Sequence, residues 1–298
     1  MRHTVTGVMG VGRMIALCSI ALQAAPALAQ QIVLPLPEGP GYGSRYTSAN
    51  AGGLLETGPM GGGATVNPPM AGETPSFRPL GSAIGEVTST LEGEAWSGQG
   101  DRVESGTRVS LLNNYTHGLG QDCEVAVTVP FEWVNYFGGY TGFGDTEVAV
   151  RKYLYDPNKA GGTTIVVSGK LYLPTGEISH STGIGRFSGG PSVMAAHPFG
   201  SRSQGYAGIG YNVVGQPTGY DLHNVLYYWA GGVTGLNTRW TAQYEVEHYI
   251  SVFNEGWTRA TVDMSRRLSP TSCLRLSIKQ ELQADGHATT LGVGYSSR

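Results

Sequence analysis

The sequence predicts an all-β protein: an antiparallel up-and-down transmembrane β-barrel of about 12 strands, preceded by a disordered N-terminal extension. The first observation is a period of two in three consecutive segments between Trp240 and Leu282, because strands have this period and helices do not. The second is composition, since 46 glycines and 16 tyrosines with only 14% charged residues suit strands and tight turns. The third is the segment length of about ten residues, which crosses a bilayer at a tilt near 45°.

Each of these three segments has one apolar face and one charged face. In the first of them, Tyr244 and Val246 share a face, while Glu245 and Glu247 lie on the other. His248 is the one polar residue on the apolar face. If the apolar face meets lipid, the charged face lines the inside of a closed barrel.

The first 29 residues are expected to form a secretory signal peptide. Arg2 and Arg13 give a positive start, residues 14–25 form a short apolar core, and Ala29 ends a small-residue cleavage site. The apolar core is too short for a membrane anchor. Cleavage is therefore expected after Ala29.

Residues 30–80 are expected to be a disordered extension. They show no hydrophobic periodicity, and proline and glycine recur throughout, as in Gly61-Gly62-Gly63. Such a segment cannot bury enough apolar surface to offset its ordering entropy. A plug or a partner-binding tail is the alternative that remains open.

From residue 81 to residue 298, extended segments follow one another, separated by turn residues. The expected strands are 86–95, 108–115, 123–133, 147–154, 164–173, 183–197, 205–214, 221–233, 240–250, 259–268, 274–282 and 289–295. The sixth to eighth are the weakest, because they are rich in glycine or apolar on both faces. Pro130 lacks a ladder donor and is expected at a bulge or a strand end. An even number of strands places both ends of the barrel on one side, which an export signal would make the periplasmic side.

Aromatic residues gather near the ends of the apolar runs, which favours a membrane barrel. They are Phe131, Trp133, Tyr153, Tyr155, residues 227–229, Trp240, Trp257 and Tyr295. Amphipathic rings at both ends of an apolar band are typical of a bilayer interface. The alternative class, a secreted or periplasmic β-sandwich binding module, would spread the same rings through a soluble core.

Two cysteines, Cys123 and Cys273, remain once the predicted signal is removed. They open the third and eleventh expected strands, which are four strands apart around a closed barrel. At about 4.8 Å per strand the separation is near 19 Å, beyond the reach of a disulfide. We therefore expect both thiols to be free.

For a barrel, function lies on the inward face, where charged residues are the candidate site. The predicted lumen-lining residues are Glu92, Glu94, Arg108, Glu147, Arg151, Lys170, Glu245, Glu247, Asp263, Arg275, Lys279 and Glu281. A small barrel holds such charges only if they are paired or hydrated. Paired charges could close the lumen, and hydrated charges could line a narrow path; the sequence leaves both open.

Signals for other classes of function are weak. The pair His180-Ser181 could serve a barrel enzyme acting on lipid, but no nucleophile elbow surrounds the serine. No histidines lie at metal-ligand spacing, and no Lys/Arg cluster offers a surface for a phosphate backbone. We therefore expect no enzymatic activity, cofactor, metal site or nucleic-acid partner.

Three short motifs resemble a known group of proteins. Gly142-Phe143-Gly144-Asp145-Thr146 with Arg151-Lys152-Tyr153, the turn Leu173-Pro174-Thr175-Gly176, and Val129-Pro130-Phe131 resemble the outer-membrane family named for the meta pathway of phenol degradation. The resemblance covers roughly residues 84–296. It implies a channel or transporter in the outer membrane of a Gram-negative bacterium, passing small molecules, hydrophobic or aromatic compounds among them. The implied partners are outer-membrane lipid, a small solute and the outer-membrane assembly machinery.

Overall fold

The computed structural model describes residues 80, 84–98, 106–120, 122–135, 139–154, 162–177, 182–217, 224–251, 256–283 and 286–298. The predicted signal peptide, the predicted extension up to residue 79, His180, Ser181 and Tyr155 lie outside the described residues. Within the described ranges, no helix is long and apolar enough to cross a membrane.

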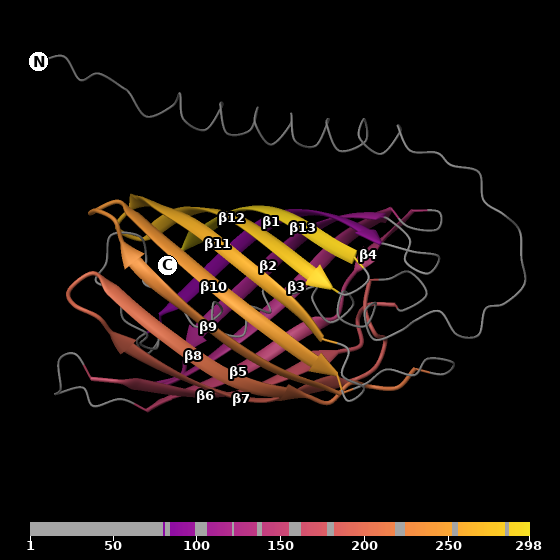
Figure 1. Cartoon of the computed structure of the whole chain (residues 1–298), viewed down its shortest axis with the longest axis horizontal. Helices are drawn as coiled ribbons and strands as arrows, with labels where there is room; N and C mark the ends of the chain where they lie inside the picture. The colour runs from indigo at the N-terminus through magenta and orange to yellow at the C-terminus, as the bar shows by residue number, and fades with distance from the viewer. Residues whose placement is uncertain are drawn as a thin grey trace, which may run out of the picture. The chain divides into compact units, whose positions relative to one another are not determined.

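The described residues form one antiparallel sheet that closes on itself (Figure 1). Its strands are β1 Gly85–Gly98, β2 Gly106–Gly118, β3 Cys123–Asn135, β4 Tyr140–Phe143, β5 Thr146–Leu154, β6 Thr164–Leu173, β7 Ser188–Pro198, β8 Ser203–Asn212, β9 Val225–Gly235, β10 Trp240–Ser251, β11 Gly256–Ser269, β12 Ser272–Gln283 and β13 Gly286–Ser297. Strands that follow one another in sequence pair with each other, except β4 with β5, and β1 pairs with β13 to close the ring. Because β4 and β5 both pair with β3 and continue one line, the wall has twelve members, as the sequence predicts.

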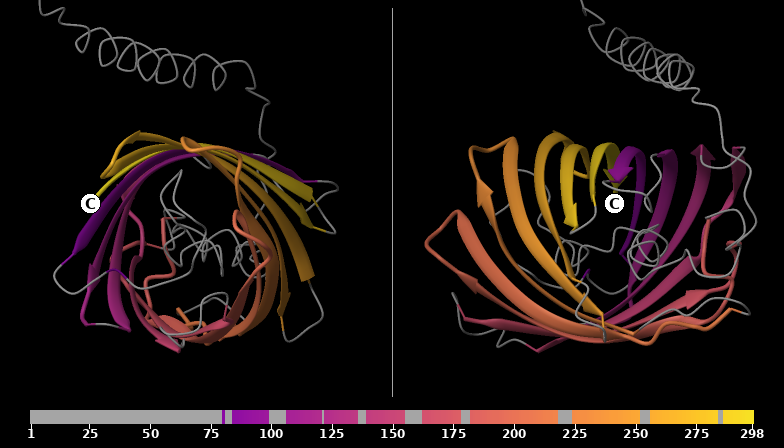
Figure 2. Two further views of the ribbon diagram at one scale, coloured as in Figure 1. Left: turned by 90° about the vertical axis from the view of Figure 1, so that its left-hand side faces the viewer. Right: turned by 45° about the vertical axis from the view of Figure 1, so that its right-hand side comes forward.

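Both ends of the barrel chain lie at one rim. Val87 pairs with Ser297, and the tight turn at 270–271 lies at the same rim, which we call the terminal end. The opposite rim, which we call the loop end, is crossed by longer connections such as those that follow β6 and β8. The end-on view in Figure 2 shows the strands as a ring around an interior. The predicted placement of both barrel ends on one side is confirmed.

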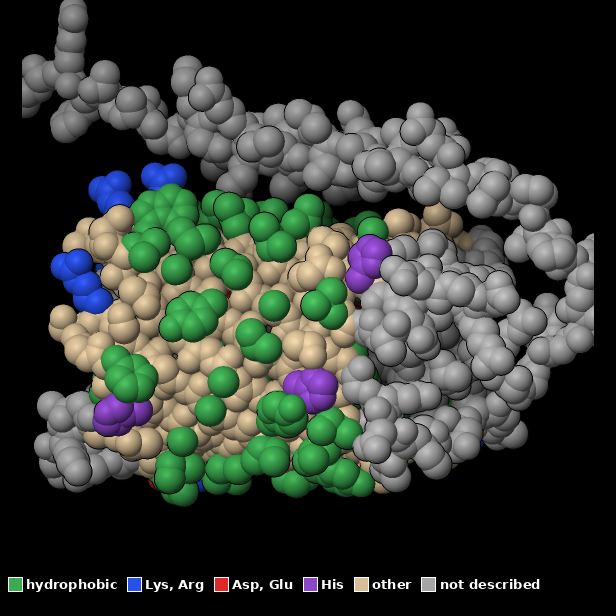
Figure 3. All heavy atoms as spheres, viewed as in Figure 1, with side chains coloured by type: hydrophobic (Ala, Val, Ile, Leu, Met, Phe, Trp, Pro, Cys, Tyr) green, Lys and Arg blue, Asp and Glu red, His purple; other side chains and the backbone are tan. Residues whose placement is uncertain are grey.

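The predicted alternation of faces is also confirmed. On β10, Tyr244 and Val246 are 58% and 52% exposed, while Glu245 and Glu247 are buried. His248 lies on the outer face, where its Nδ1 lies 2.9 Å from the Thr258 hydroxyl. Figure 3 shows hydrophobic side chains spread over one outer face, with the visible Lys and Arg side chains toward one end. On these strands the apolar side chains therefore face outward and the charged side chains face the interior.

The glycine-rich segments that look weakest in the sequence are strands because glycine makes room for interior rings. A Cβ on Gly208 would collide with the indole of Trp229, and a Cβ on Gly210 would collide with the ring of Tyr227. The pairs lie opposite each other on β8 and β9. The strand boundaries differ from the expected ones, since 183–187 lies in the connection before β7.

Pro130 sits beside a bulge, as predicted. Between the pairs Thr128–Glu147 and Phe131–Phe143, the strand line of β4 and β5 contains one more residue than β3. Gly144 lies in this interruption and donates its N–H to the Pro130 carbonyl at 3.0 Å. Proline has no N–H to donate to the ladder, and the extra residue on the facing strand line interrupts the regular pairing at this position.

The assignment of aromatic residues to the membrane interface is wrong for four of them. Tyr153, Tyr227, Trp229 and Trp257 are only 1–4% exposed and belong to the interior apolar cluster. The register explains the error, since Tyr153 is two residues after the inward Arg151 and so must point inward. Trp133, Tyr228 and Tyr295 do lie on the outer face, at 41%, 47% and 42% exposure.

Cys123 and Cys273 are both free, as expected. Their strands, β3 and β12, are separated around the ring by β2, β1 and β13. The order of the strands around the barrel therefore keeps the two cysteines apart.

Gly208→Ala is predicted to destabilise the barrel, because the added methyl group must displace the Trp229 indole. Overpacking of this kind costs about 1–3 kcal/mol. Gly93→Ala is the matched control, since nothing lies within 4 Å of a Cβ at that outward position. The measurement is the temperature at which the folded band on an unboiled gel is lost. Equal temperatures for the two variants would contradict the packing described here.

Candidate functional site

The interior of the barrel has two chemically different halves. Strands β5 to β11, with the connections that follow β6 and β8, carry an apolar cluster. Its members are Tyr153, Val166, Tyr172, Ile184, Met194, Ala196, Tyr206, Val214, Val225, Tyr227, Trp229, Val233, Tyr249 and Trp257. The wall of β1–β3 and β11–β13 carries mainly ion pairs. The candidate site is this charged half and its boundary with the apolar cluster.

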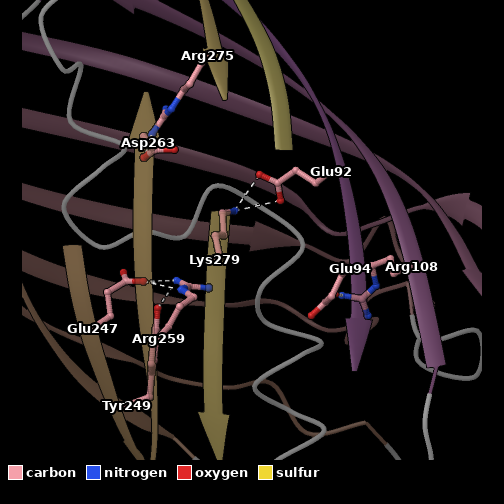
Figure 4. Close-up of polar contacts among 9 residues, drawn as sticks. All are labelled: Glu92, Glu94, Arg108, Glu247, Tyr249, Arg259, Asp263, Arg275 and Lys279. Carbon is pink, nitrogen blue, oxygen red and sulfur yellow. Dashed lines mark hydrogen bonds and ion pairs between the residues drawn. The ribbon is translucent and has the colours of Figure 1, made fainter. Parts of the chain in front are cut away.

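In the interior, acidic and basic side chains meet in pairs (Figure 4). Lys279 Nζ on β12 lies 2.8 and 3.0 Å from the two carboxylate oxygens of Glu92 on β1. This contact passes over β13 at Gly292, where a side chain would collide with Ser277 and approach Glu92. Glycine at that position therefore permits an ion pair between strands that are not neighbours.

Arg108 on β2 lies between two carboxylates. Its Nη1 is 3.5 Å from Glu94 on β1, and its Nε is 3.9 Å from Glu132 on β3. The guanidinium carbon also lies 5.9 Å from the centre of the Trp96 ring. Because β1, β2 and β3 are neighbouring strands, they hold the three side chains close together. The Arg108 cation therefore offsets the charges of both Glu94 and Glu132.

Arg259 joins the charged half to the aromatic cluster. Its Nε donates to Glu247 at 2.6 Å, and its Nη2 donates to the Tyr249 hydroxyl at 2.6 Å. Tyr249 stacks on Trp257 with ring centres 4.7 Å apart and stacks on Tyr227 at 5.8 Å. We call the stacked rings of Trp229, Tyr227, Tyr249 and Trp257 the aromatic row. Arg259 contacts this row through the Tyr249 hydroxyl.

Near the terminal end, Glu124 is fully buried and receives three donors. Arg151 donates to it at 2.9 Å, the Tyr153 hydroxyl at 2.7 Å, and the backbone N–H of Leu80 at 3.3 Å. Glu147 accepts from the Tyr172 hydroxyl at 2.9 Å. These carboxylates thus accept hydrogen bonds from neighbours on the wall and, for Glu124, from Leu80, which lies before β1 in the sequence.

A small pocket lies on the charged half. It is lined by Glu92, Glu94, Arg108, Ser110, Leu112, Arg259, Lys279, Glu281 and Thr290. Carboxylates and cations face it from four different strands. A polar solute in this pocket would meet groups of both signs.

All twelve predicted residues occupy inward positions on their strands. Eight are buried: Arg108, Glu147, Arg151, Lys170, Glu245, Glu247, Asp263 and Glu281. The side chains of Glu92, Glu94, Arg275 and Lys279 keep 13%, 20%, 29% and 18% exposure. Among these residues, Glu92 forms an ion pair with Lys279 and Glu94 forms one with Arg108. Asp263 forms a third ion pair with Arg275, at 2.6 Å.

Glu124, Glu132 and Arg259 also make central contacts of the interior, although they are not among the twelve candidates. The period-two pattern predicts all three on the charged, inward face of their strands, and all three are buried. The set also omits the aromatic row, because its rings resemble a membrane belt in the sequence. Among the described residues, no group of three or more His, Cys, Asp or Glu side chains could hold a metal ion.

Comparison with known proteins identifies the fold. No family model matches the sequence, and the search of curated proteins finds no match. By structure, the chain is similar to an outer-membrane channel from Pseudomonas putida F1, with a TM-score of 0.58 and 12% identity over 74% of this chain and 97% of that one. It is also similar to the NanC porin, with a TM-score of 0.51 and 10% identity over 70% of this chain and 99% of that one. The chain therefore has the closed antiparallel barrel fold found in outer-membrane channels.

Arg259→Met is predicted to destabilise the protein by about 3–5 kcal/mol, because it leaves the buried Glu247 carboxylate without its cation. Adding Glu247→Gln to the same chain should recover much of the loss, since the uncompensated charge is then gone. Unfolding in urea, followed by tryptophan fluorescence, measures both. Lys152→Met is the control, because its pair with Asp122 is about half exposed on both sides. A loss no greater than that of the control would contradict the role assigned to Arg259.

Proposed function

We propose that this chain is a barrel of the Gram-negative outer membrane and acts as a passive channel for small molecules. The observation that carries the proposal is the opposition of the two faces: an apolar outer wall around an interior lined with charges. Structures with TM-scores above 0.5 are described as an outer-membrane channel and a porin, which supports the same function. No enzymatic role is proposed.

The outer wall supports placement in a bilayer. Large apolar side chains with 44–59% exposure follow one another on β12 and β13, at Leu276, Ile278, Leu282, Leu291 and Val293. In water, a contiguous apolar surface of this extent would favour aggregation, whereas lipid covers it without cost. On this proposal the partners are outer-membrane lipid and, during insertion, the assembly machinery.

The proposed path follows the charged half of the interior. Glu92, Lys279 and Arg275 keep part of their side-chain surface exposed although they are paired, so the charged half is accessible to water. The aromatic half is packed more tightly, with rings that are nearly fully buried. Of the two arrangements open from the sequence, we therefore favour hydrated pairs that line a narrow path.

The family and the class of solute are proposed from the resemblance of the three sequence motifs. We propose membership of the family named for the meta pathway of phenol degradation, with hydrophobic or aromatic compounds among the solutes. We also propose a signal peptide at 1–29 and a separate extension at 30–80 before the barrel.

The function is tested by inserting the purified full chain into planar lipid bilayers. A passive channel should give discrete current steps without any energy source. The size of each step should increase linearly with the applied voltage. Membranes that bind the folded protein but show no steps would contradict the channel.

Lys279→Met is predicted to shift ion selectivity toward cations. The variant removes the cation that faces Glu92, so the carboxylate is left to attract cations along the path. The reversal potential in a potassium chloride gradient measures the shift. Lys152→Met removes the same charge from an outward, exposed position and should leave the reversal potential unchanged. Equal potentials for both variants would exclude Lys279 from the path.

A further inference from the structure

The terminal end of the barrel carries exposed arginines along one part of its rim. Arg202 lies in the turn before β8, Arg239 lies in the turn before β10, and Arg266 lies near the end of β11. All three are exposed, and we call them the basic rim. In Figure 3 the visible Lys and Arg side chains lie toward this end, next to hydrophobic side chains.

Backbone hydrogen bonds place the members of the basic rim close to one another. The Gly235 N–H at the end of β9 donates to the Arg202 carbonyl at 2.8 Å, and the Arg267 N–H on β11 donates to the Arg239 carbonyl at 2.8 Å. The strands concerned, β8 to β11, are consecutive neighbours in the sheet. At about 4.8 Å per strand, the basic rim spans about 14 Å. Three guanidinium groups therefore share a short arc of the terminal end.

No carboxylate side chain balances this positive charge. None of the residues in 197–206, 232–243 and 264–275, which form this part of the terminal end, is Asp or Glu. Within the described part of the chain, the basic rim forms no ion pair, whereas Lys152 at the same end pairs with Asp122. The basic rim is therefore a surface of net positive charge.

The basic rim borders the apolar outer wall. The Arg266 guanidinium carbon lies 5.6 Å from the centre of the Trp240 ring, and these residues are partners in the β10–β11 ladder. Two outward pairs further along this ladder, Tyr244 and Val262 face each other and are exposed. A tryptophan between an apolar wall and exposed cations is typical of a bilayer interface. A molecule that covers both surfaces needs an anionic head and an apolar tail.

We propose that the basic rim binds anionic phospholipids, with the headgroup phosphates against the arginines and the acyl chains on the outer wall beside Trp240. Guanidinium groups suit this ligand, because they donate two parallel hydrogen bonds to phosphate oxygens. A zwitterionic headgroup fits less well, since this part of the rim offers no carboxylate to its ammonium group. The inference rests on the proposed placement of the barrel in a membrane, but it does not depend on the passage of solutes.

Trp240 reports lipid contact at the basic rim, because bromine atoms on acyl chains quench the fluorescence of an indole that they touch. Trp133 is also exposed, near the loop end, so Trp133→Phe removes its signal. The full chain with this change is placed in phosphatidylcholine liposomes that contain the same fraction of either brominated phosphatidylglycerol or brominated phosphatidylcholine. Brominated phosphatidylglycerol should quench Trp240 more strongly, and the difference measures the preference for the anionic lipid.

Arg202→Gln and Arg239→Gln, in the same background, should each lower this preference about fivefold, because each removes one cation that attracts the headgroup. Arg266 is left unchanged, since it contacts the reporting ring. Lys152→Gln is the matched control, because it removes the same charge at the same end from a residue that already has a carboxylate partner. It should keep the preference, and all variants should keep the unboiled gel mobility of the folded protein.

The outcomes distinguish the inference from the function on which it rests. If the folded chain enters liposomes but the two brominated lipids quench Trp240 equally, the inference is overturned and the membrane barrel stands. The inference is also overturned if both arginine variants keep the preference, or if Lys152→Gln loses as much of it as they do. A chain that stays outside the liposomes would instead contradict the proposed membrane barrel itself.

Discussion

The pairing of β1 with β13 is the constraint on which the rest of the structure depends. Once the sheet closes, it has no edge, and every strand residue faces either the outside or the interior. Since side chains alternate along the strands, closure sends apolar side chains outward and places the charged residues and the apolar cluster in the interior. Ion pairs offset much of this charge, and one of them, between Glu92 of β1 and Lys279 of β12, joins strands that only closure brings together.

The two halves of the interior are filled by different kinds of side chain. On β8–β11, glycines opposite large rings allow Tyr227 and Trp229 to lie against the wall, so apolar contact fills the space. On the charged half, long side chains reach toward one another and leave a pocket between them. Arg259 belongs to both halves, because it binds Glu247 and contacts the Tyr249 ring at 5.4 Å. The interior therefore has an apolar cluster on one side and ion pairs around a pocket on the other.

Much of the fold can be predicted from the sequence, because period-two alternation is a local signal. Glu245 and Glu247 are inward for the same reason that Tyr244 and Val246 are outward, and neither assignment needs a distant contact. The aromatic row is different, since an interior ring and an interfacial ring have the same local pattern at the end of a strand. Placing Trp229 inside depends on Gly208 of the neighbouring strand, and that pairing is not a property of either segment alone. The partner choices of the charges, such as Lys279 reaching over Gly292, depend in the same way on closure. The hydrogen bonds of Asp145 with the N–H groups of Gly176 and Ile184 depend on a connection folding back onto a bulge, which no periodicity encodes.

The most direct test of a closed barrel in the outer membrane is fractionation followed by gel mobility with and without boiling. A closed barrel resists detergent until heated, so the protein should be found in the outer-membrane fraction, and its unboiled mobility should differ from its boiled mobility. Recovery in the soluble periplasmic fraction, with one mobility under both conditions, would contradict the membrane barrel and favour a soluble β-sheet protein.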